Sequence, residues 1–188
     1  MKIEIEKPDI ITLNYKQEKS DEDYGSCLWA RFYFDNKNYT LSIESDCGNY
    51  MYGWVSTPDT ESFLHLMSRI GKYYLLSKIS SETQVNGDAT SEAVKEYLNE
   101  VLDEEEPDFD YKDIDNVCYY SSVDEVYNAI LDYVRETNAY NDFFEEYSIW
   151  ECIVTDYPCQ AKKIASIFIE KVQPYIKKYL LNAEEENE

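Results

Sequence analysis

The chain has few of the residues on which most catalytic and structural metal sites depend. Its 188 residues include one histidine, His65, and five cysteines without a Cys-x-x-Cys pair. Structural zinc sites use closely spaced Cys or His ligands, so the sequence predicts none. A Gly-rich phosphate loop and the GxSxG and HExxH motifs are also absent, which removes common nucleotide-binding and hydrolase signatures. We therefore expect a protein that is not an enzyme and carries no cofactor or metal, with His65 a partly exposed structural residue.

Long apolar runs are missing as well. No stretch approaches the roughly 18 apolar residues of a membrane helix, and the first residues do not resemble a secretion signal. Scattered cysteines in such a chain are expected to be reduced and largely buried. The sequence therefore predicts a cytoplasmic protein without membrane contact.

Glycine and proline are scarce, with 5 of each, whereas 44% of the residues are hydrophobic and 15% are aromatic. Disordered chains are poor in aromatic and β-branched residues, so this composition indicates a folded protein. The length suits one domain or two small lobes.

Basic residues are also few, especially in the middle of the chain. The chain has 39 acidic and 17 basic residues, for a net charge of −22. Residues 82–146 hold 20 acidic and 3 basic residues, a net of −17, whereas residues 1–81 carry −3 and residues 147–188 carry −2. Such a field repels nucleic acid and anionic membranes and attracts basic surfaces. We therefore expect no direct binding to DNA or RNA.

Aromatic and β-branched runs separated by turn residues predict an antiparallel sheet near the N-terminus. Residues 27–34 suit a central strand, and residues 39–44 alternate apolar and polar side chains. The turn residues 35–38 between them predict a β-hairpin. Further strands are expected at 10–15 and 50–54.

Helical spacing of apolar residues begins after this sheet. It predicts helices over residues 61–70 and 73–79, and the Asn-Gly-Asp turn at 86–88 indicates a lobe boundary. Beyond it, helices are expected over 91–102 and 122–136, the second opened by a Ser-x-x-Glu capping box.

The last part of the chain combines a short apolar run with a long helical pattern. Residues 148–155 predict a strand, and residues 158–181 predict a helix kinked near Pro174. Together these elements predict an α+β protein. An N-terminal antiparallel sheet with packed helices (residues 1–81) is followed by an acidic, mainly helical lobe (residues 82–188).

Two helices of the acidic lobe carry rows of acidic residues. Glu92, Glu96 and Glu100 recur every four residues, which spaces the carboxylates about 6 Å apart along one face. Like charges at this spacing destabilise a helix by about 0.2–0.5 kcal/mol per pair. On the next helix, Asp132 and Glu136 lie within about 20° of Glu125 around the axis. The rows therefore suggest a surface kept negative at some cost in stability.

The predicted partner-binding surface combines these two rows with the acidic loop between them. It comprises Glu92, Glu96, Glu100, Asp103, Glu104, Glu105, Glu106, Asp108, Asp110, Asp113, Asp115, Glu125, Asp132 and Glu136.

The acidic loop has a superficial likeness to a calcium-binding loop. Within residues 108–115, Lys112 stands where an EF-hand needs a ligand, and the turn glycine is missing. The sequence therefore predicts no specific calcium site. A carboxylate-dependent hydrolase remains a third reading, and it would need carboxylates that converge in a cleft.

The first half of the chain contains three characteristic sequences: SCLWARFYF at residues 26–34, YTLSIESDCGNY at 39–50 and YGW at 52–54. In these it resembles a family of small, uncharacterised proteins of bacteriophages and prophages of low-GC Gram-positive bacteria. The acidic lobe is similar in kind to phage anti-CRISPR and anti-restriction proteins, several of which imitate nucleic acid. The resemblance implies a mobile-element protein in the cytoplasm of a bacterial host.

The leading hypothesis is an anti-CRISPR-type inhibitor. It would bind a basic nucleic-acid-binding protein, a CRISPR effector nuclease, and block nucleic-acid binding or cleavage through the acidic surface. The alternative is a phage accessory or assembly module that pairs with a basic protein, uses apolar contacts of the first lobe and inhibits no nuclease. The sequence leaves the oligomeric state open.

Overall fold

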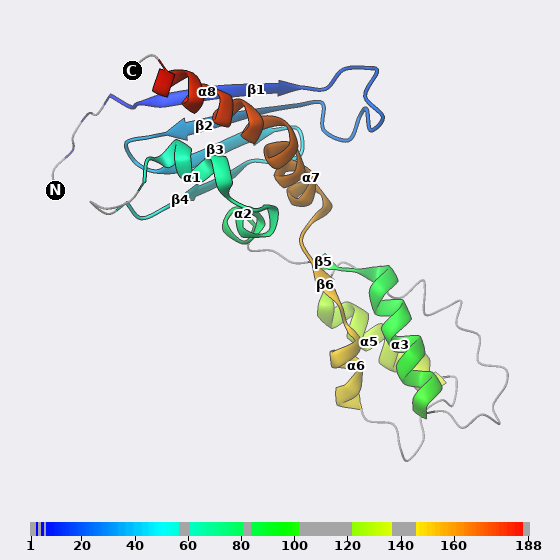
Figure 1. Ribbon diagram of the computed structural model, residues 1–188. Helices are drawn as coiled ribbons and strands as arrows, with labels where there is room; N and C mark the ends of the chain where they lie inside the picture. Colours follow the sequence, from blue (N-terminus) through cyan, green and yellow to red (C-terminus); the bar gives the residue numbers. More distant parts are fainter. Residues whose placement is uncertain are drawn as a thin grey trace. The chain divides into compact units, whose positions relative to one another are not determined.

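The structure is a computed structural model that describes residues 3, 5, 7–56, 61–80, 84–101, 122–136 and 146–185 (Figure 1). The chain divides into two compact units. Unit 1 comprises Met1–Ser81 together with Pro158–Glu188, and unit 2 comprises Glu82–Tyr157. Each unit has its own secondary structure and is described separately. Among the described residues, no helix has both the length and the apolar character needed to cross a membrane.

Unit 1 contains the predicted antiparallel sheet. Its strands are β1 (Ile10–Lys16), β2 (Trp29–Asp35), β3 (Thr40–Ser45) and β4 (Tyr50–Gly53), in the order β1-β2-β3-β4. Each strand pairs antiparallel with the next along the chain. The predicted α+β class and the hairpin of β2 and β3 are therefore confirmed.

Turn chemistry fixes the hairpin. The Asp35 carboxylate accepts hydrogen bonds from the backbone N–H groups of Lys37 (3.1 Å) and Asn38 (3.0 Å). An aspartate at this position commonly caps a turn in this way. The turn thereby sets the register in which Phe34 lies opposite Leu41.

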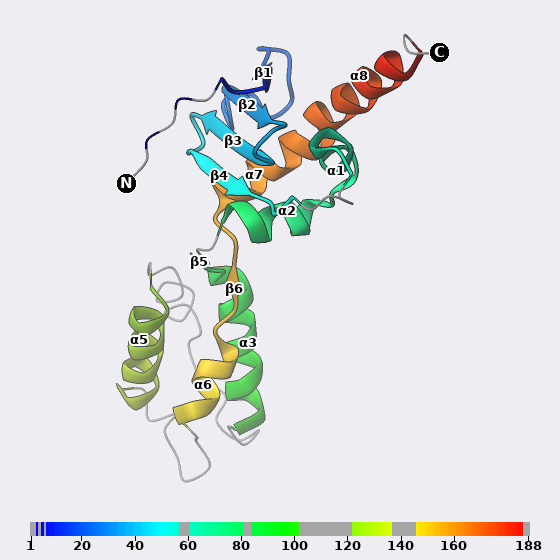
Figure 2. The same cartoon turned by 90° about the vertical axis from the view of Figure 1, so that its left-hand side faces the viewer.

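One face of the sheet is buried and the other is open. Along β2 the side chains of Ala30, Phe32 and Phe34 are fully buried, whereas the alternate residues Trp29 and Arg31 are partly or largely exposed. Figure 2 shows the helices of unit 1 gathered on one side of the sheet. These helices are α1 (Phe63–Arg69), α2 (Lys72–Ile79), α7 (Cys159–Ile167), the π-helical segment η1 (Phe168–Val172) and α8 (Gln173–Glu185).

The C-terminal helices belong to unit 1, although the sequence grouped residues 158–188 with the second lobe. The ring of Phe168 lies 5.9 Å from that of Phe32 and 6.3 Å from that of Phe34, between centroids. The Gln173 amide donates 3.0 Å hydrogen bonds to the carbonyl oxygens of Met67 and Ile70. The apolar sheet face needs this cover, and no local pattern says which helices supply it.

A π-helical turn stands beside the predicted kink. The backbone N–H of Gln173 bonds the carbonyl of Phe168, five residues earlier, and α8 begins at Gln173. Pro174 has no N–H to donate to a helical hydrogen bond. Such π-turns within helices commonly mark places where the regular ladder is interrupted.

Unit 2 is mainly helical. It contains α3 (Gly87–Val101), α5 (Val123–Glu136) and α6 (Glu146–Cys152), with the short strands β5 (Gln84–Val85) and β6 (Thr155–Asp156) paired antiparallel. One apolar cluster joins the three helices, formed by Val94, Leu98, Val126, Ile130, Leu131, Val134, Ile149 and Cys152.

The helices predicted over 91–102 and 122–136 are found as α3 and α5, but α3 begins at Gly87, within the turn predicted at 86–88. The Ser122 hydroxyl accepts the backbone N–H of Glu125 at 3.1 Å, as the capping box predicted. The predicted strand over 148–155 is wrong, because α6 continues to Cys152. Ile149 and Cys152 are three residues apart and enter the core from one side of that helix. A short apolar run does not by itself distinguish a strand from a buried helical turn.

Candidate interaction surfaces

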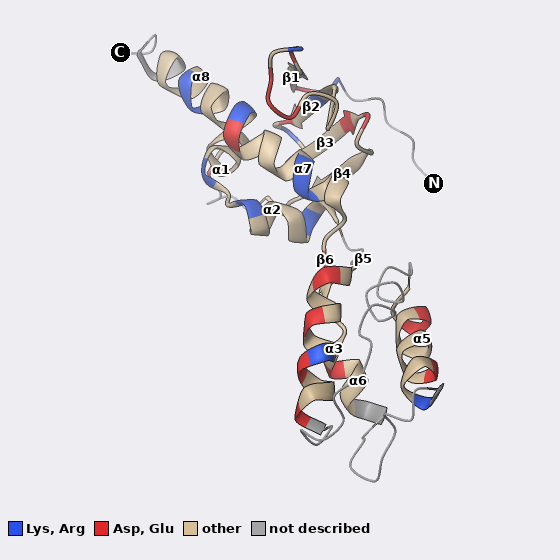
Figure 3. Ribbon diagram, turned by 90° about the vertical axis from the view of Figure 1, so that its right-hand side faces the viewer, with Lys and Arg blue, Asp and Glu red and all other residues tan. Residues whose placement is uncertain are grey.

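The acidic row of α3 lies on the side of the helix opposite its core face. Val94 and Leu98 are 1% exposed, whereas Glu92, Glu96 and Glu100 are all exposed. Glu96 is about 180° around the axis from the midpoint of the two core residues. In Figure 3 acidic positions mark successive turns of α3. The helix therefore presents to solvent the row that the sequence predicted.

Part of this row borders a shallow hollow. The hollow has a volume of about 420 Å³ and is lined by Asp88, Ser91, Glu92, Lys95, Glu96 and Asn99. Its lining holds three acidic residues and one basic residue, so an occupant with positive charge would be favoured. The hollow is open to solvent.

The acidic row of α5 is arranged in the same way. Glu125 and Asp132 are exposed, whereas Val126 and Ile130 are fully buried in the core of unit 2. The backbone of Glu136 ends the helix, but its side chain lies outside the described residues. Each row thus lies on the outer side of its own helix, with the shared core on the inner side.

The remaining predicted site residues lie outside the described residues. The structure therefore places Glu92, Glu96, Glu100, Glu125 and Asp132 in full and only the backbone of Glu136. The residues without a described position are those of the acidic loop: Asp103, Glu104, Glu105, Glu106, Asp108, Asp110, Asp113 and Asp115.

The division into units confines the negative charge to a shorter segment than the sequence predicted. Unit 2 holds 22 acidic and 3 basic residues, a net of −19, whereas unit 1 holds 17 acidic and 14 basic residues, a net of −3. The helices α2, α7 and α8 of unit 1 carry basic positions, as Figure 3 shows. Residues 158–188 hold 5 acidic and 5 basic residues, so their place in unit 1 leaves both net charges unchanged and confines the −19 to the shorter segment Glu82–Tyr157.

Several acidic side chains of unit 1 are paired with basic ones. Ion pairs join Arg31 to Glu44 at 3.3 Å, Arg69 to Glu61, and Lys163 to Asp23. The hydrogen bond from Lys163 is the main reason that the pKa of Asp23 is lowered. These three acidic residues of unit 1 thus contribute to local structure.

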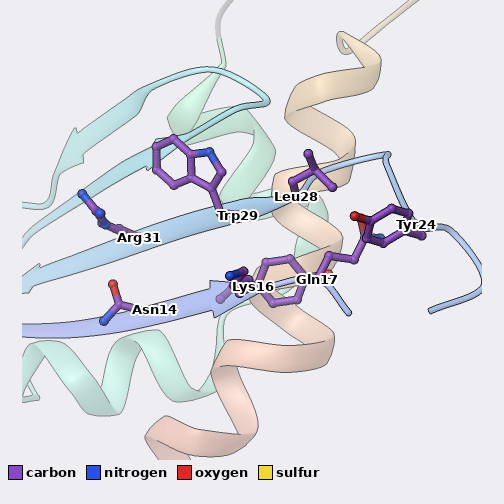
Figure 4. A pocket seen from close by; sticks show the side chains of 8 residues that line it. Asn14, Lys16, Gln17, Tyr24, Leu28, Trp29 and Arg31 are labelled. Atoms are coloured by element: carbon purple, nitrogen blue, oxygen red, sulfur yellow. The ribbon is translucent and has the colours of Figure 1, made fainter. Parts of the chain in front are cut away.

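A second candidate surface lies on the open face of the sheet. The alternative hypothesis assigned apolar contacts to the lobe of Trp29 and Trp54, but the sequence did not locate this groove. It is a groove of about 580 Å³ at the ends of β1 and β2. Figure 4 shows side chains of both strands projecting into it. The lining residues are Asn14, Tyr15, Lys16, Gln17, Tyr24, Leu28, Trp29 and Arg31.

Two residues of β2 dominate this groove. The Arg31 guanidinium carbon lies 5.4 Å from the centroid of the Trp29 ring, within range of a cation–π interaction. The guanidinium also pairs with Glu44, whose carboxylate accepts a 3.1 Å hydrogen bond from the Tyr33 hydroxyl. The alternation of β2 was the available signal, since residues 29, 31 and 33 share one face. The prediction treated this run as a central strand without separating its faces.

The one histidine lies at a helix start. His65 is exposed on α1, and its Nδ1 lies 2.6 Å from the Oγ of Ser62, which also accepts the His65 backbone N–H. Ser62 is the N-cap of α1. His65 therefore interacts with the N-cap residue of α1 through both its ring and its backbone.

The thiols are mostly buried, as predicted, with one exception. Cys27, Cys47 and Cys152 are buried, whereas Cys159 is exposed at the start of α7. Cys118 lies outside the described residues. Burial, together with the nearby carboxylates of Glu151 and Glu100, raises the pKa of Cys152.

Comparison with known proteins gives one family. Neither the curated proteins nor the experimentally determined structures include a significant match to the chain. The phage family phiTE_072, in contrast, matches residues 2–178, which is nearly the whole chain and includes both units. The resemblance to phage proteins is therefore confirmed at the level of the family, and the chain belongs to this phage protein family.

Proposed function

We propose that this phage protein binds a basic, nucleic-acid-binding protein of the bacterial host through the acidic surface of unit 2. The leading candidate is a CRISPR effector nuclease whose nucleic-acid binding or cleavage is blocked. The observation that carries the proposal is the confinement of a net charge of −19 to one compact unit. The proposed activity is binding, with no catalytic residue.

The geometry of α3 supports a surface that competes with nucleic acid. Carboxylates four residues apart on a helix are about 6 Å apart, close to the spacing of phosphates along one strand. Channels that hold nucleic acid are lined with Lys and Arg and bind polyanions largely through counterion release. An ordered acidic helix can meet the same basic side chains.

The repulsion between like charges on α3 also supports a binding role. Glu92 and Glu96 form one like-charge pair at i,i+4, and Glu96 and Glu100 form another. Each pair costs about 0.2–0.5 kcal/mol. A row kept at such a cost suits a binding role, because complementary charge speeds association and excludes acidic partners.

The test compares two variants with the same change in charge. E92Q/E96Q/E100Q removes the row of unit 2, and the control E18Q/E22Q/E170Q removes three exposed glutamates of unit 1. Binding to a guide-loaded CRISPR effector and cleavage of its target are measured over a salt series. We expect the wild type and the control to bind and inhibit, with affinity that falls as salt rises, and the first variant to bind more weakly.

Two results would contradict this proposal. Unchanged target cleavage in the presence of excess protein would show that the protein does not inhibit that effector. An equal loss of binding in both variants would show that total charge matters and the α3 row does not.

The open sheet face favours a second candidate function, a phage accessory or assembly module. Trp29, Leu28 and Met51 lie on this face or at its edge, and Met51 is 70% exposed. A partner held by these side chains would bind independently of salt, and W29A would weaken it whereas E92Q/E96Q/E100Q would not. Pulldown of the tagged protein from a host lysate, followed by mass spectrometry, would identify that partner.

A further inference from the structure

Two cysteines and an aspartate meet at one end of the sheet in unit 1. Ala30 near the start of β2 lies opposite Ser45 at the end of β3. Antiparallel pairing therefore brings Cys27, just before β2, beside Asp46 and Cys47, just after β3. Cys27 is 1% exposed and Cys47 is 8% exposed, whereas Asp46 is exposed.

The three side chains have the spacing of a metal-ligand set. One ligand atom from each lies within 4.8 Å of the other two, and the Sγ of Cys27 is 3.3 Å from Oδ1 of Asp46. In tetrahedral zinc, bonds of about 2.3 Å to sulfur and 2.0 Å to oxygen place those two ligands about 3.5 Å apart. The observed separation requires only a small adjustment.

Hydrogen bonds hold the carboxylate in place. The backbone N–H of Leu28 donates to Oδ2 of Asp46 at 2.8 Å, which leaves Oδ1 directed toward the Cys27 thiol. Trp29 adds a longer contact of 3.4 Å from its N–H to Oδ1. Outer contacts of this kind orient metal ligands and raise affinity.

The turn that carries Cys47 is also fixed. Ser45 Oγ accepts the N–H of Cys47 at 3.2 Å and donates to the carbonyl of Gly48 at 2.6 Å. Gly48 has a φ of 111°, a left-handed conformation that favours glycine. The Tyr50 hydroxyl closes the turn by donating to the carbonyl of Cys47 at 2.9 Å.

We propose that Cys27, Cys47 and Asp46 form a binding site for a thiophilic divalent cation of the Zn²⁺ type. Two sulfur ligands select such ions against Ca²⁺ and Mg²⁺, which prefer oxygen. Water completes the tetrahedron. The ion links the start of β2 to the turn between β3 and β4 and stabilises unit 1 by mass action.

Proton release balances the charge on binding. In the metal-free protein the Cys27 thiol faces the Asp46 carboxylate, and the Cys47 thiol donates to the carbonyl of Ser26 at 3.1 Å. Cysteine binds the metal as the thiolate, so each thiol releases its proton when M²⁺ binds, and the affinity should rise with pH.

Two complementary variants separate this site from the other cysteines. C118S/C152S/C159S keeps Cys27 and Cys47 alone, and C27S/C47S keeps the other three. Each protein is fully reduced with a phosphine and titrated with Zn²⁺ by native mass spectrometry and with Cd²⁺ by its thiolate charge-transfer absorption. We expect one ion in the wild type and in the first variant, a raised melting temperature of both, and no such ion in C27S/C47S.

D46N provides a test that keeps both thiols and an oxygen for the Leu28 N–H. We expect it to weaken Zn²⁺ binding by at least about tenfold while the fold, monitored by circular dichroism, is retained. Absence of bound Zn²⁺ and Cd²⁺ in the reduced wild type would overturn the proposal. Equal binding by the two complementary variants, or a D46N affinity equal to the wild type, would overturn it too.

Discussion

Unit 1 and unit 2 are built on the same kind of apolar core and differ in how they use charge. Phe32 and Phe34 are fully buried in unit 1, as are Val126 and Ile130 in unit 2. Unit 1 nearly balances its 17 acidic residues with 14 basic ones, whereas unit 2 has 3 basic residues for 22 acidic ones. Folding in both units therefore depends on the apolar pattern. The outer face of unit 2 is not needed for the core, so its acidic residues are available for binding.

The units also differ in continuity. Unit 2 is one uninterrupted segment, whereas unit 1 joins Met1–Ser81 to Pro158–Glu188. The sheet of unit 1 therefore acquires part of its cover only from the last helices of the chain. Non-local contacts of this kind carry a larger loop-closure cost than the local packing of unit 2.

The largest effect is expected from core truncation, which tests whether the two units are separate. F32A removes a fully buried ring that contacts Phe168 and should cost about 3–5 kcal/mol, and I130A in unit 2 should cost about 2–5 kcal/mol. Hydrogen exchange should show each loss of protection within the unit that carries the substitution. If either variant lost protection equally in both units, the two units would not be separate in stability.

A smaller effect is expected from removing a buried side-chain hydrogen bond, which we consider for one residue in each unit. Thr90 in unit 2 is fully buried, and its hydroxyl accepts the N–H of Val154 at 3.0 Å. Gln173 in unit 1 binds the carbonyls of Met67 and Ile70. T90V and Q173L should each cost about 1–3 kcal/mol in denaturant unfolding, because buried partners lose their hydrogen bonds. T90S keeps the hydroxyl and is the control; a cost equal to that of T90V would assign the effect to packing.

Charge neutralisation should have opposite signs in the two units. E92Q/E96Q/E100Q removes two like-charge pairs and should stabilise unit 2 by about 0.4–1 kcal/mol. E44Q in unit 1 removes the charge that pairs with Arg31 and leaves Tyr33 a neutral, weaker acceptor, so it should destabilise slightly. Thermal unfolding with and without added salt measures both. If the triple substitution lowered the stability of unit 2, the three glutamates would be making favourable contacts that outweigh their mutual repulsion.

The smallest effect is expected from the ion pair between Asp23 and Lys163 in unit 1. The hydrogen bond from Lys163 lowers the folded-state pKa of Asp23. This contribution to stability is therefore present above the unfolded value of about 3.9 and is lost as the pH falls through the lower folded value. D23N lacks it at every pH, so the difference in unfolding free energy between D23N and the wild type should disappear in acid. A difference that persisted there would point to the Gln17 hydrogen bond of Asp23 instead.

Local patterns were sufficient for most elements of the fold. Alternation and turn residues predicted the four strands of the sheet, and the spacing around Val94 and Leu98 predicted α3. The exposed acidic row followed from the same periodicity, since a helix with one apolar face turns the opposite face to solvent. The strand predicted over 148–155 failed because a short apolar run fits either period.

The tertiary structure alone decided which distant segments meet. Pairing of β2 with β3 brings Cys27 beside Cys47, twenty positions later, although their spacing in the sequence suggests no site. The same holds for Phe168, which packs on Phe32. The sequence by itself determined the fold class, the four strands of the sheet, most of the helices and the acidic character of one region, because these depend on neighbouring residues. The unit boundaries, the open sheet face and the thiol–carboxylate cluster depend on long-range packing, which has no local pattern.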